Sequence, residues 1–423
     1  MGTLLRVASS LVLSLSSLAG AAELPALRID GNRIVDAAGT PVTLRGVNLG
    51  NWLMIETGNF GGTLGDVKDQ HAVFTALRDR FGEAERRRLI GIYRDHYITA
   101  RDFDAVKRFD FNLVRVGLDY ELFEDDERPM RLRDDAFKYL DFAVREAKAR
   151  GIYVWFDLHR AQEHQVNGRQ GGREGYTRFW ADESARERSL WLWEQIAERY
   201  KDEPAVFGYE PLNEPFSAKP DQLRDYCAKW YERIRKVDAK KVVLMPNIQP
   251  DRIDFYGKPK ENGWTNAMFD LHFYPGSFDR VTATQPATPR VNTRFLTERL
   301  PQWSARMREI GAPLAIGEMN VVFKGAGGGE MIRRWYDYAA REGWPITIWT
   351  LKELTASGGA HERMWMITTN AGPLAKVDIH TAPKEAIEAY FRGMSTMPLM
   401  DDPDTLHWLT TKDAPRPLTP ATR

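Results

Sequence analysis

The sequence predicts an α/β protein folded as a (β/α)8 TIM barrel, with a small β-hairpin ahead of the barrel. Two observations carry this prediction: short apolar runs rich in β-branched residues recur along the 423 residues, and amphipathic stretches of helical length lie between them. Parallel strands need crossover connections of this kind, and eight strand–helix units close into a barrel. A doubly wound open sheet is the alternative that has the same local pattern.

The N-terminal hairpin is predicted at residues 27–36, where apolar and polar residues alternate around Asp30-Gly31-Asn32. The barrel strands are predicted where apolar runs recur after it. Their ranges are 42–47, 112–116, 152–158, 206–212, 242–246, 268–272, 314–317 and 346–349. That count of eight is the one a closed barrel requires.

Helices are predicted between these runs. The clearest begins with Asp134 as N-cap and ends at Gly151, with Phe137, Leu140 and Val144 on one face. The others cover approximately residues 182–200, 220–238, 293–310 and 329–342. Each precedes a predicted strand, as the βα alternation requires.

Composition narrows the class of protein. The chain has 59 Lys+Arg and 59 Asp+Glu, interspersed along its length, so no overall field would attract nucleic acid. The single cysteine, Cys227, cannot form an internal disulfide. It lies in a run with helical apolar spacing, which predicts a small buried residue rather than a reactive thiol.

The two ends of the chain have distinct patterns. Residues 1–22 combine Arg6, an apolar stretch and small residues, which predicts a signal peptide and a secreted or periplasmic protein. No later apolar run is long enough to cross a bilayer. We expect a catalytic domain over residues 23–394 and a proline-rich tail over 395–423, present as an extended strap or a frayed end.

Polar residues gather where the predicted strands end. In a barrel, these positions meet at one rim, and that rim carries the active site. The residues are Arg115, Asp157, His159, Asn213, Glu214, His272, Tyr274, Glu318 and Trp349. Each alone could be structural, but packing does not explain the whole set at one rim.

The two glutamates in this set indicate the chemistry. Glu214 and Glu318 follow strands on opposite sides of the predicted barrel mouth. Cleavage of a glycosidic bond requires two such carboxyl groups, because one protonates the leaving oxygen while the other attacks or activates water. We expect Arg115 to keep Glu318 ionised, and surroundings of low dielectric to keep Glu214 protonated.

No cofactor and no metal site are predicted. Residues 159–164, HRAQEH, have one residue too many for a zinc-binding H-x-x-E-H helix. Residues 325–330, GAGGGE, lack the third glycine of a dinucleotide loop and the ending of a P-loop, and no G-x-S-x-G elbow is present.

Several motifs together resemble the family-5 glycoside hydrolases of the cellulase superfamily. They are Leu-Asn-Glu-Pro at 212–215, Ile-Gly-Glu at 316–318, the Asp-Leu-His run, the His-x-Tyr run and Arg115. Residues 44–56, 97–116 and 347–353 look most like the exo-β-1,3-glucanase branch. The resemblance covers approximately residues 27–355.

This resemblance implies a retaining mechanism, with Glu214 as acid/base and Glu318 as nucleophile. It also implies roles for seven further residues around the sugar. Asn213 would bond the 2-hydroxyl, Arg115 and Tyr274 would orient the nucleophile, His159 and His272 would line the −1 subsite, Trp349 would form its floor, and Glu56 would close the pocket around a non-reducing-end glucose.

The expected substrate is a β-glucan or a β-linked oligosaccharide. An endo-β-1,4-glucanase remains an alternative, because loops 51–70, 160–180 and 250–267 decide between a pocket and an open groove. Trp180 and Trp264 lie in these loops, either as sugar platforms or as buried residues. A carbohydrate-binding barrel without catalysis is the alternative from another class.

Overall fold

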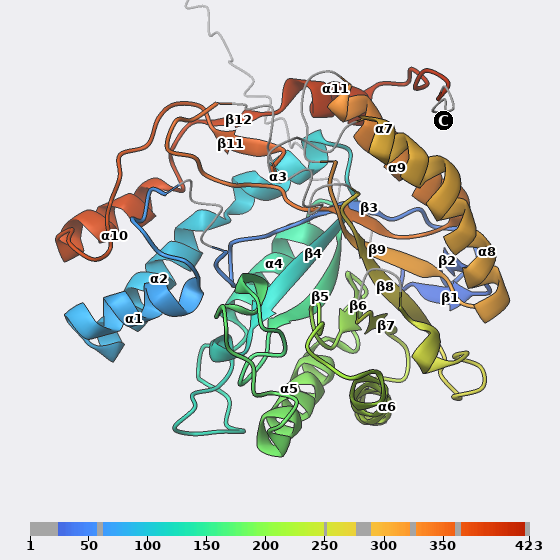
Figure 1. Cartoon of the computed structure of the whole chain (residues 1–423), viewed down its shortest axis with the longest axis horizontal. Coiled ribbons are helices and arrows are strands. Elements are labelled where there is room, and N and C mark those ends of the chain that lie inside the picture. The colour runs from blue at the N-terminus through green and yellow to red at the C-terminus, as the bar shows by residue number, and fades with distance from the viewer. Residues whose placement is uncertain are drawn as a thin grey trace, which may run out of the picture.

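The computed structural model describes residues 24–56, 62–248, 252–275, 289–321, 327–359 and 365–418. Its centre is a closed barrel of eight parallel strands in the order β10-β3-β4-β5-β6-β7-β8-β9 (Figure 1). The predicted (β/α)8 fold is confirmed, and the open sheet is excluded because β10 pairs with both β9 and β3.

All eight predicted strands are present. Their observed bounds are β3 Arg45–Asn48, β4 Leu113–Asp119, β5 Tyr153–Arg160, β6 Val206–Glu210, β7 Val242–Pro246, β8 Ala267–Phe273, β9 Leu314–Met319 and β10 Ile346–Ile348. Most are buried along their whole length, as expected for strands covered by helices on one face and by the barrel interior on the other.

The helices surround the barrel (Figure 1). They are α1 Gln70–Phe81, α2 Glu83–Tyr97, α3 Ala100–Arg108, α4 Lys138–Lys148, α5 Glu183–Tyr200, α6 Pro220–Val237, α7 Pro289–Arg294, α8 Leu300–Ile310, α9 Gly328–Glu342, α10 Lys384–Gly393 and α11 Pro403–Thr410. Short turns of other helix types lie at Tyr120–Leu122, Arg169–Gly171, Asp254–Tyr256 and Phe295–Arg299.

The predicted helix at 134–151 is shorter than expected. Phe137, not Asp134, is the N-cap of α4, and residues 134–137 form turns before it. An acidic residue before an apolar face favours an N-cap, but here the main chain turns once more before the helix begins. Leu140 and Val144 do face the core, as the periodicity predicts.

The N-terminal hairpin is confirmed. It closes the end of the barrel at which the parallel strands begin. Strands β1 Arg28–Asp30 and β2 Arg33–Val35 pair antiparallel across Asp30↔Arg33. Ile34 packs into an apolar cluster with inward-facing barrel residues that include Leu113 and Trp155. This cluster fills the barrel interior between the hairpin and the carboxyl ends of the strands, where the polar residues lie. The barrel is therefore a packed core and not a pore.

The expectation of an extended or frayed tail is wrong for residues 399–410. Strand β12 Leu399–Asp401 pairs antiparallel with β11 Thr368–Asn370, and helix α11 follows it at once. Helix α11 begins with a side-chain cap from Asp402 and with Pro403 at its first turn, where the missing proline N–H costs nothing. Pro403 therefore starts a helix instead of preventing one.

The predicted signal peptide at 1–22 lies outside the described residues. Within the described part of the chain, no helix is long and apolar enough to span a membrane.

Candidate active site

The alternation of side chains along the strands places the site. On β5, Tyr153 and Trp155 join the apolar cluster inside the barrel, and Asp157 and His159 continue the same face toward the carboxyl end. On β9, a register shift at Gly317 lets Glu318 pair with His272 and contact Arg115. A Cβ at Gly317 would lie 2.5 Å from an oxygen of Asp270, so only glycine fits this position.

Arg115 is the centre of the site and is fully buried. Its Nη1 donates to Glu318 Oε1 at 2.9 Å, and its Nη2 donates to Asn213 Oδ1 at 2.9 Å. Its Nε and Nη2 also donate to the two oxygens of Glu210, at 3.0 and 3.2 Å. An arginine held by a bidentate contact to Glu210 and by a further hydrogen bond to Asn213 cannot reorient, so it fixes the position of Glu318.

Glu318 accepts hydrogen bonds at both oxygens. Arg115 binds Oε1, and the Tyr274 hydroxyl donates to Oε2 at 2.6 Å. Burial and the charge of Glu318 raise the pKa of Tyr274 well above its ordinary value, so its hydroxyl stays a donor.

Glu214 follows β6 on a loop and has a φ of 40°, which is uncommon for a residue other than glycine. His272 Nδ1 lies 2.8 Å from Oε1, and Gln170 Nε2 donates to Oε2 at 3.1 Å. His272 Nδ1 is also 3.4 Å from Glu318 Oε2, so one imidazole nitrogen faces both predicted catalytic carboxylates.

The expected order of the two carboxyl pKa values is wrong. Burial raises the pKa of Glu318, and the charge of Glu214 adds to this effect, against His272 and Arg115. Burial also acts to raise the pKa of Glu214, but the hydrogen bond and charge of His272 outweigh it and lower that pKa. The sequence could not show that His272 would lie against Glu214.

His272 itself is surrounded by acids. Burial lowers its pKa, but the charges of Glu318 and Asp270 outweigh burial and raise the pKa well above its ordinary value. Nε2 lies 3.0 Å from Asp270 Oδ2, although the angle is poor for a hydrogen bond. The imidazole therefore holds a proton between the carboxyl groups.

His159 joins the remaining predicted residues. Its Nδ1 lies 2.7 Å from Asp157 Oδ2, its ring stacks on Trp349 at 5.4 Å, and its Nε2 lies 3.5 Å from Glu56 Oε1. Asn213 Nδ2 is 3.2 Å from the same Nε2. All nine predicted site residues are thus connected through contacts in one site.

The protonation of His159 is subject to two opposing influences. Burial lowers its pKa, whereas the carboxylates of Asp157 and Glu56 raise it to about 9. Arg115, however, fixes the Asn213 amide with its oxygen toward the guanidinium, so Nδ2 must donate to His159 Nε2. This hydrogen bond favours a neutral ring whose Nδ1–H points to Asp157.

Sequence reasoning missed several residues of the site. Glu210 and Asp270 lie inside apolar strands, and an acidic residue in a fully buried strand was the signal that could have identified them. Asn48, at the end of β3, accepts from Arg115 Nη1 at 3.1 Å. Gln170 and Trp365 come from loops and had no pattern to mark them.

Two groups within the described residues could each offer three metal ligands. They are Glu210, Asp270 and His272, and Glu214, His272 and Glu318, with ligand atoms within 4.8 Å of one another in each group. His272 belongs to both groups, and it already contacts Glu214 through a hydrogen bond and Asp270 through a charged contact. The prediction that the site needs no metal stays a prediction.

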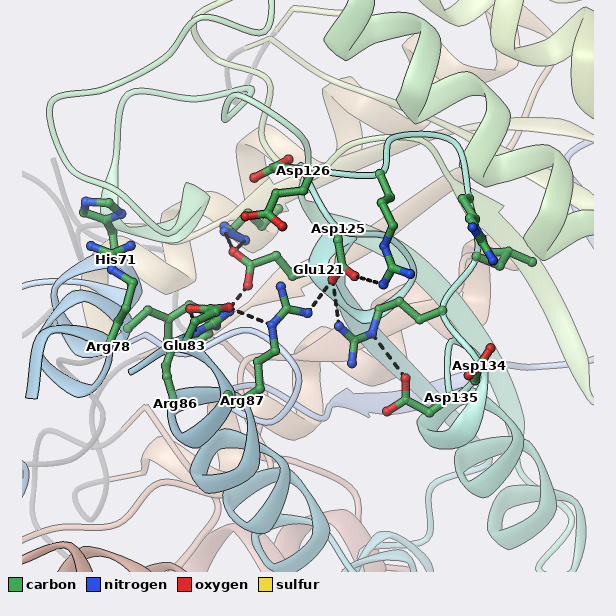
Figure 2. A pocket seen from close by; sticks show the side chains of 18 residues that line it. His71, Arg78, Glu83, Arg86, Arg87, Glu121, Asp125, Asp126, Asp134 and Asp135 are labelled. Atoms are coloured by element: carbon green, nitrogen blue, oxygen red, sulfur yellow. Dashed lines mark hydrogen bonds and ion pairs between the residues drawn. The ribbon is translucent and has the colours of Figure 1, made fainter. Parts of the chain in front are cut away.

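A large cavity of about 1040 Å³ lies beside the site and does not contain its carboxylates (Figure 2). Helices α1 and α2 and the loop after β4 form it, and arginine and acidic side chains line it.

Many of the charged side chains in this cavity pair with one another, for example Arg86 with Glu121 at 3.0 Å and Arg133 with Asp125 at 2.8 Å. Arg160, next to His159, reaches the same cavity and pairs with Asp119 at 2.7 Å. These pairs brace the loop after β4 against the strand that carries His159.

Trp180 and Trp264 are both 8% exposed. Each packs against other aromatic rings, and Trp180 Nε1 donates to Gln165 O at 2.8 Å. The buried alternative therefore holds for both residues.

Comparisons with known proteins identify the family of the chain. The model of the family described as cellulase (glycosyl hydrolase family 5) matches residues 79–354. The chain is 30% identical over 250 residues to a beta-xylosidase from Phanerodontia chrysosporium, covering 59% of this chain and 52% of that protein. It is 30% identical over 271 residues to a probable glucan 1,3-beta-glucosidase A from Aspergillus terreus, covering 63% and 64%.

The chain thus spans between about half and two thirds of the length of these curated relatives. Among solved structures, a rutinosidase from Aspergillus niger matches with a TM-score of 0.58 and 16% identity, over 82% of this chain and 98% of that one, which supports the fold alone. The family match covers the strands that carry Arg115, His159, Glu214 and Glu318 and, together with the barrel, shows that the chain belongs to glycosyl hydrolase family 5.

Proposed function

We propose that this protein is a retaining β-glycosidase that hydrolyses β-glucosidic bonds in β-glucan or related oligosaccharides, with Glu214 as acid/base and Glu318 as nucleophile. The observation that carries the proposal is the closeness of the two carboxyl groups. An oxygen of Glu214 and an oxygen of Glu318 lie within 4.8 Å of each other. Retaining glycosidases hold these groups about 5–5.5 Å apart, whereas inverting enzymes need about 6.5–9.5 Å to admit a water molecule.

In the first step, Glu318 attacks the anomeric carbon while Glu214 protonates the glycosidic oxygen, and the bond to the leaving group breaks. Arg115 and Tyr274 support Glu318 as the nucleophile, because each donates to one of its oxygens and so favours the ionised form. Glu214 obtains its proton from His272, whose Nδ1 is 2.8 Å from Oε1. This route allows Glu214, whose own pKa is lowered, to act as an acid.

In the second step, Glu214 acts as a base on water, which attacks the anomeric carbon and releases Glu318. Asn213 would meet the 2-hydroxyl of the sugar, with its amide fixed by Arg115 and His159. Trp349, stacked on His159, would form the floor of the −1 subsite.

A terminal glucose and a β-1,3 linkage are the preferred substrate features. This preference is supported by Glu56, which lies 3.5 Å from His159 at the edge of the site, and by relatives named glucan 1,3-beta-glucosidase. A β-xylosidase is the second candidate, because one relative carries that name. The endo-β-1,4-glucanase alternative stays a prediction, because residues 57–61 and 249–251 of two deciding loops lie outside the described residues.

One screen tests the proposal. Purified protein is incubated with laminarin, carboxymethyl cellulose, mannan, xylan, short oligosaccharides, and aryl β-glucoside and β-xyloside. We expect glucose from laminarin and faster cleavage of the glucoside; faster cleavage of the xyloside would favour the second candidate. No hydrolysis of any substrate would favour a non-catalytic carbohydrate-binding barrel.

The stereochemistry tests the mechanism separately. Proton NMR of the earliest product from the best substrate should show the β-anomer before mutarotation. If the α-anomer appears first, the enzyme inverts and Glu318 is not a covalent nucleophile.

We also infer that the protein is exported, with residues 1–22 as a signal peptide and residues 23–394 as the catalytic domain. N-terminal sequencing of the protein recovered outside the cytoplasm should begin near Glu23. Recovery of the uncleaved chain in the cytoplasm would contradict this inference.

A further inference from the structure

The loop after β5 reaches back to the proposed acid/base, through a residue that the sequence did not single out. Gln170, in the short helical turn Arg169–Gly171, donates from Nε2 to Glu214 Oε2 at 3.1 Å. The other oxygen of Glu214 faces His272. Both oxygens of the acid/base are therefore in contact with neighbouring side chains.

The base of this loop is tied to the strand ends that carry the site. Gln165 Nε2 donates to the main-chain oxygens of His159 at 2.8 Å and Asn213 at 2.9 Å. Its Oε1 accepts from Ala161 N at 3.0 Å. One buried glutamine thus joins the loop to β5 and to the residue before Glu214.

The far side of the loop is tied to helix α1. Gly172 O accepts from His71 N at 2.9 Å, and Asp69, the N-cap of α1, accepts from Glu174 N at 3.0 Å. A Cβ at Gly172 would lie 2.6 Å from the Arg160 side chain, so this turn packs directly on the barrel. With both sides anchored, the turn presents Gln170 to Glu214.

We propose that Gln170 is a positioning residue for Glu214: the Gln170 amide fixes Glu214 Oε2, and the leaving-group oxygen takes the place of this amide when substrate binds. This inference depends on the proposed function, since it assigns a partner to the acid/base of that reaction. Glu214 must offer its proton to the leaving oxygen, and the Gln170 amide donates to one of the two carboxyl oxygens that could carry it. The amide stabilises the ionised carboxylate, in agreement with the lowered pKa of Glu214.

Loss of the Gln170 contact should change the pH dependence of kcat/KM in a defined direction. In the proposed mechanism Glu214 receives its proton from His272, so loss of the proton held by the Glu214–His272 pair in the free enzyme sets the alkaline limb of kcat/KM. Loss of a donor to the carboxylate disfavours the ionised form and raises its pKa. Gln170→Ala should therefore move the alkaline limb to higher pH, by about half a unit to one unit for one lost hydrogen bond.

A second variant keeps the glutamine but displaces it. A Cβ at Gly168 would lie 2.2 Å from Gln170 Oε1, and Gly168 has extended backbone angles that alanine also adopts. Gly168→Ala should push the amide away from Glu214 and shift the alkaline limb in the same direction. Arg169→Ala is the matched control, because its side chain is exposed and pairs with Glu174 instead.

The experiment measures kcat/KM against pH for wild-type protein and the three variants, with two substrates. A phenyl β-glycoside of the preferred sugar needs the acid, whereas the dinitrophenyl β-glycoside hardly does. The shift should appear with the phenyl substrate in Gln170→Ala and Gly168→Ala, and be absent with the dinitrophenyl substrate and in Arg169→Ala. Thermal melts check that each variant is folded.

Two results would overturn the inference. An unchanged alkaline limb in both Gln170→Ala and Gly168→Ala would show that Gln170 does not act on Glu214. An equal loss of kcat/KM at every pH with both substrates would show that the turn only supports the fold. If wild-type protein cleaves neither substrate, the proposed function fails instead, so the two failures are distinguishable.

Discussion

The two hydrogen bonds that Glu318 accepts make its ionisation open to test. Tyr274 donates to Oε2 at 2.6 Å, and removing this hydroxyl takes one stabilising contact from the carboxylate. The pKa of Glu318 should then rise further. As the proposed nucleophile, Glu318 would attack only when ionised, so the acidic limb of kcat/KM in Tyr274→Phe should move to higher pH, by about half a unit to one unit.

Tyr153→Phe is the control for this measurement. Its hydroxyl donates to Pro25 O at 2.9 Å, at the end of the barrel away from the site. We expect its pH profile to match that of wild-type protein. If both variants have the wild-type acidic limb, Tyr274 does not control the ionisation of Glu318.

The roles of the two glutamates can be separated by azide. Glu318→Ala should lose glycosyl-enzyme formation with every substrate. Glu214→Ala should keep the first step for a dinitrophenyl glycoside and slow the second by about 10²–10⁴-fold, because the base for water is gone. Added azide should restore turnover in both, giving the β-glycosyl azide from Glu214→Ala and the α-azide from Glu318→Ala. Reversed anomers would exchange the two roles.

At the residue scale, the sequence predicted the site residues that lie at the ends of strands. Glu214, Glu318 and Arg115 lie where apolar runs stop, so their shared rim followed from the barrel alone. Their charges did not follow, because the pKa of Glu214 depends on His272 from β8 and on Gln170 from a loop. These contacts join residues far apart in the chain, and local sequence patterns do not indicate them.

At the element scale, the strands were predictable, but part of the helical layer was not. Helices α1, α2 and α3 all lie between β3 and β4, where the alternation of one helix per strand predicts only one. Between β7 and β8 the described residues hold only the short turn Asp254–Tyr256. Tertiary packing decides the number of helices in each connection, and helical spacing alone does not show it.

The buried pair of Asp102 and Lys352 shows how these additional helices are attached. Lys352, in the segment after β10, lies 2.6 Å from Asp102 Oδ1, and both side chains are 1% exposed. Asp102 Oδ2 also accepts from Thr99 N at 2.8 Å, at the start of α3. One carboxylate therefore caps a helix and compensates a buried ammonium group.

Asp102→Ala should destabilise the protein by about 3–5 kcal/mol in urea unfolding, because it leaves Lys352 buried without its partner. The double variant Asp102→Ala/Lys352→Met should recover part of this loss, since neither charge is then buried. Asp104→Ala on the same helix, where the side chain is 59% exposed, should change stability by no more than about 0.5 kcal/mol. Equal effects of Asp102→Ala and Asp104→Ala would contradict this account.

At the scale of the whole molecule, the C-terminal residues complete the outer layer. Helix α11 packs on α9, and Gly329 N donates to Asp404 Oδ2 at 2.7 Å (Figure 1). Arg108 and Thr368 both bind Asp401, which ties β12 to α3 and β11. Proline content alone suggested an extended tail, because long-range contacts of this kind leave no periodic signal in a short segment.

The contact between α9 and α11 is close enough for one methyl group to test it. A Cβ at Gly329 would lie 2.5 Å from the main-chain oxygen of Asp404, and backbone atoms cannot yield as a flexible side chain can. Gly329→Ala should therefore destabilise the protein by about 1–3 kcal/mol. Gly91→Ala, in α2 with no atom within 4 Å of the new Cβ, is the matched control and should stabilise by about 0.5–1 kcal/mol. Opposite signs for the same chemical change would mean that α11 is packed on the barrel in solution. If Gly329→Ala is as favourable as Gly91→Ala, α11 does not occupy this position and the tail does not contribute to the stability of the barrel.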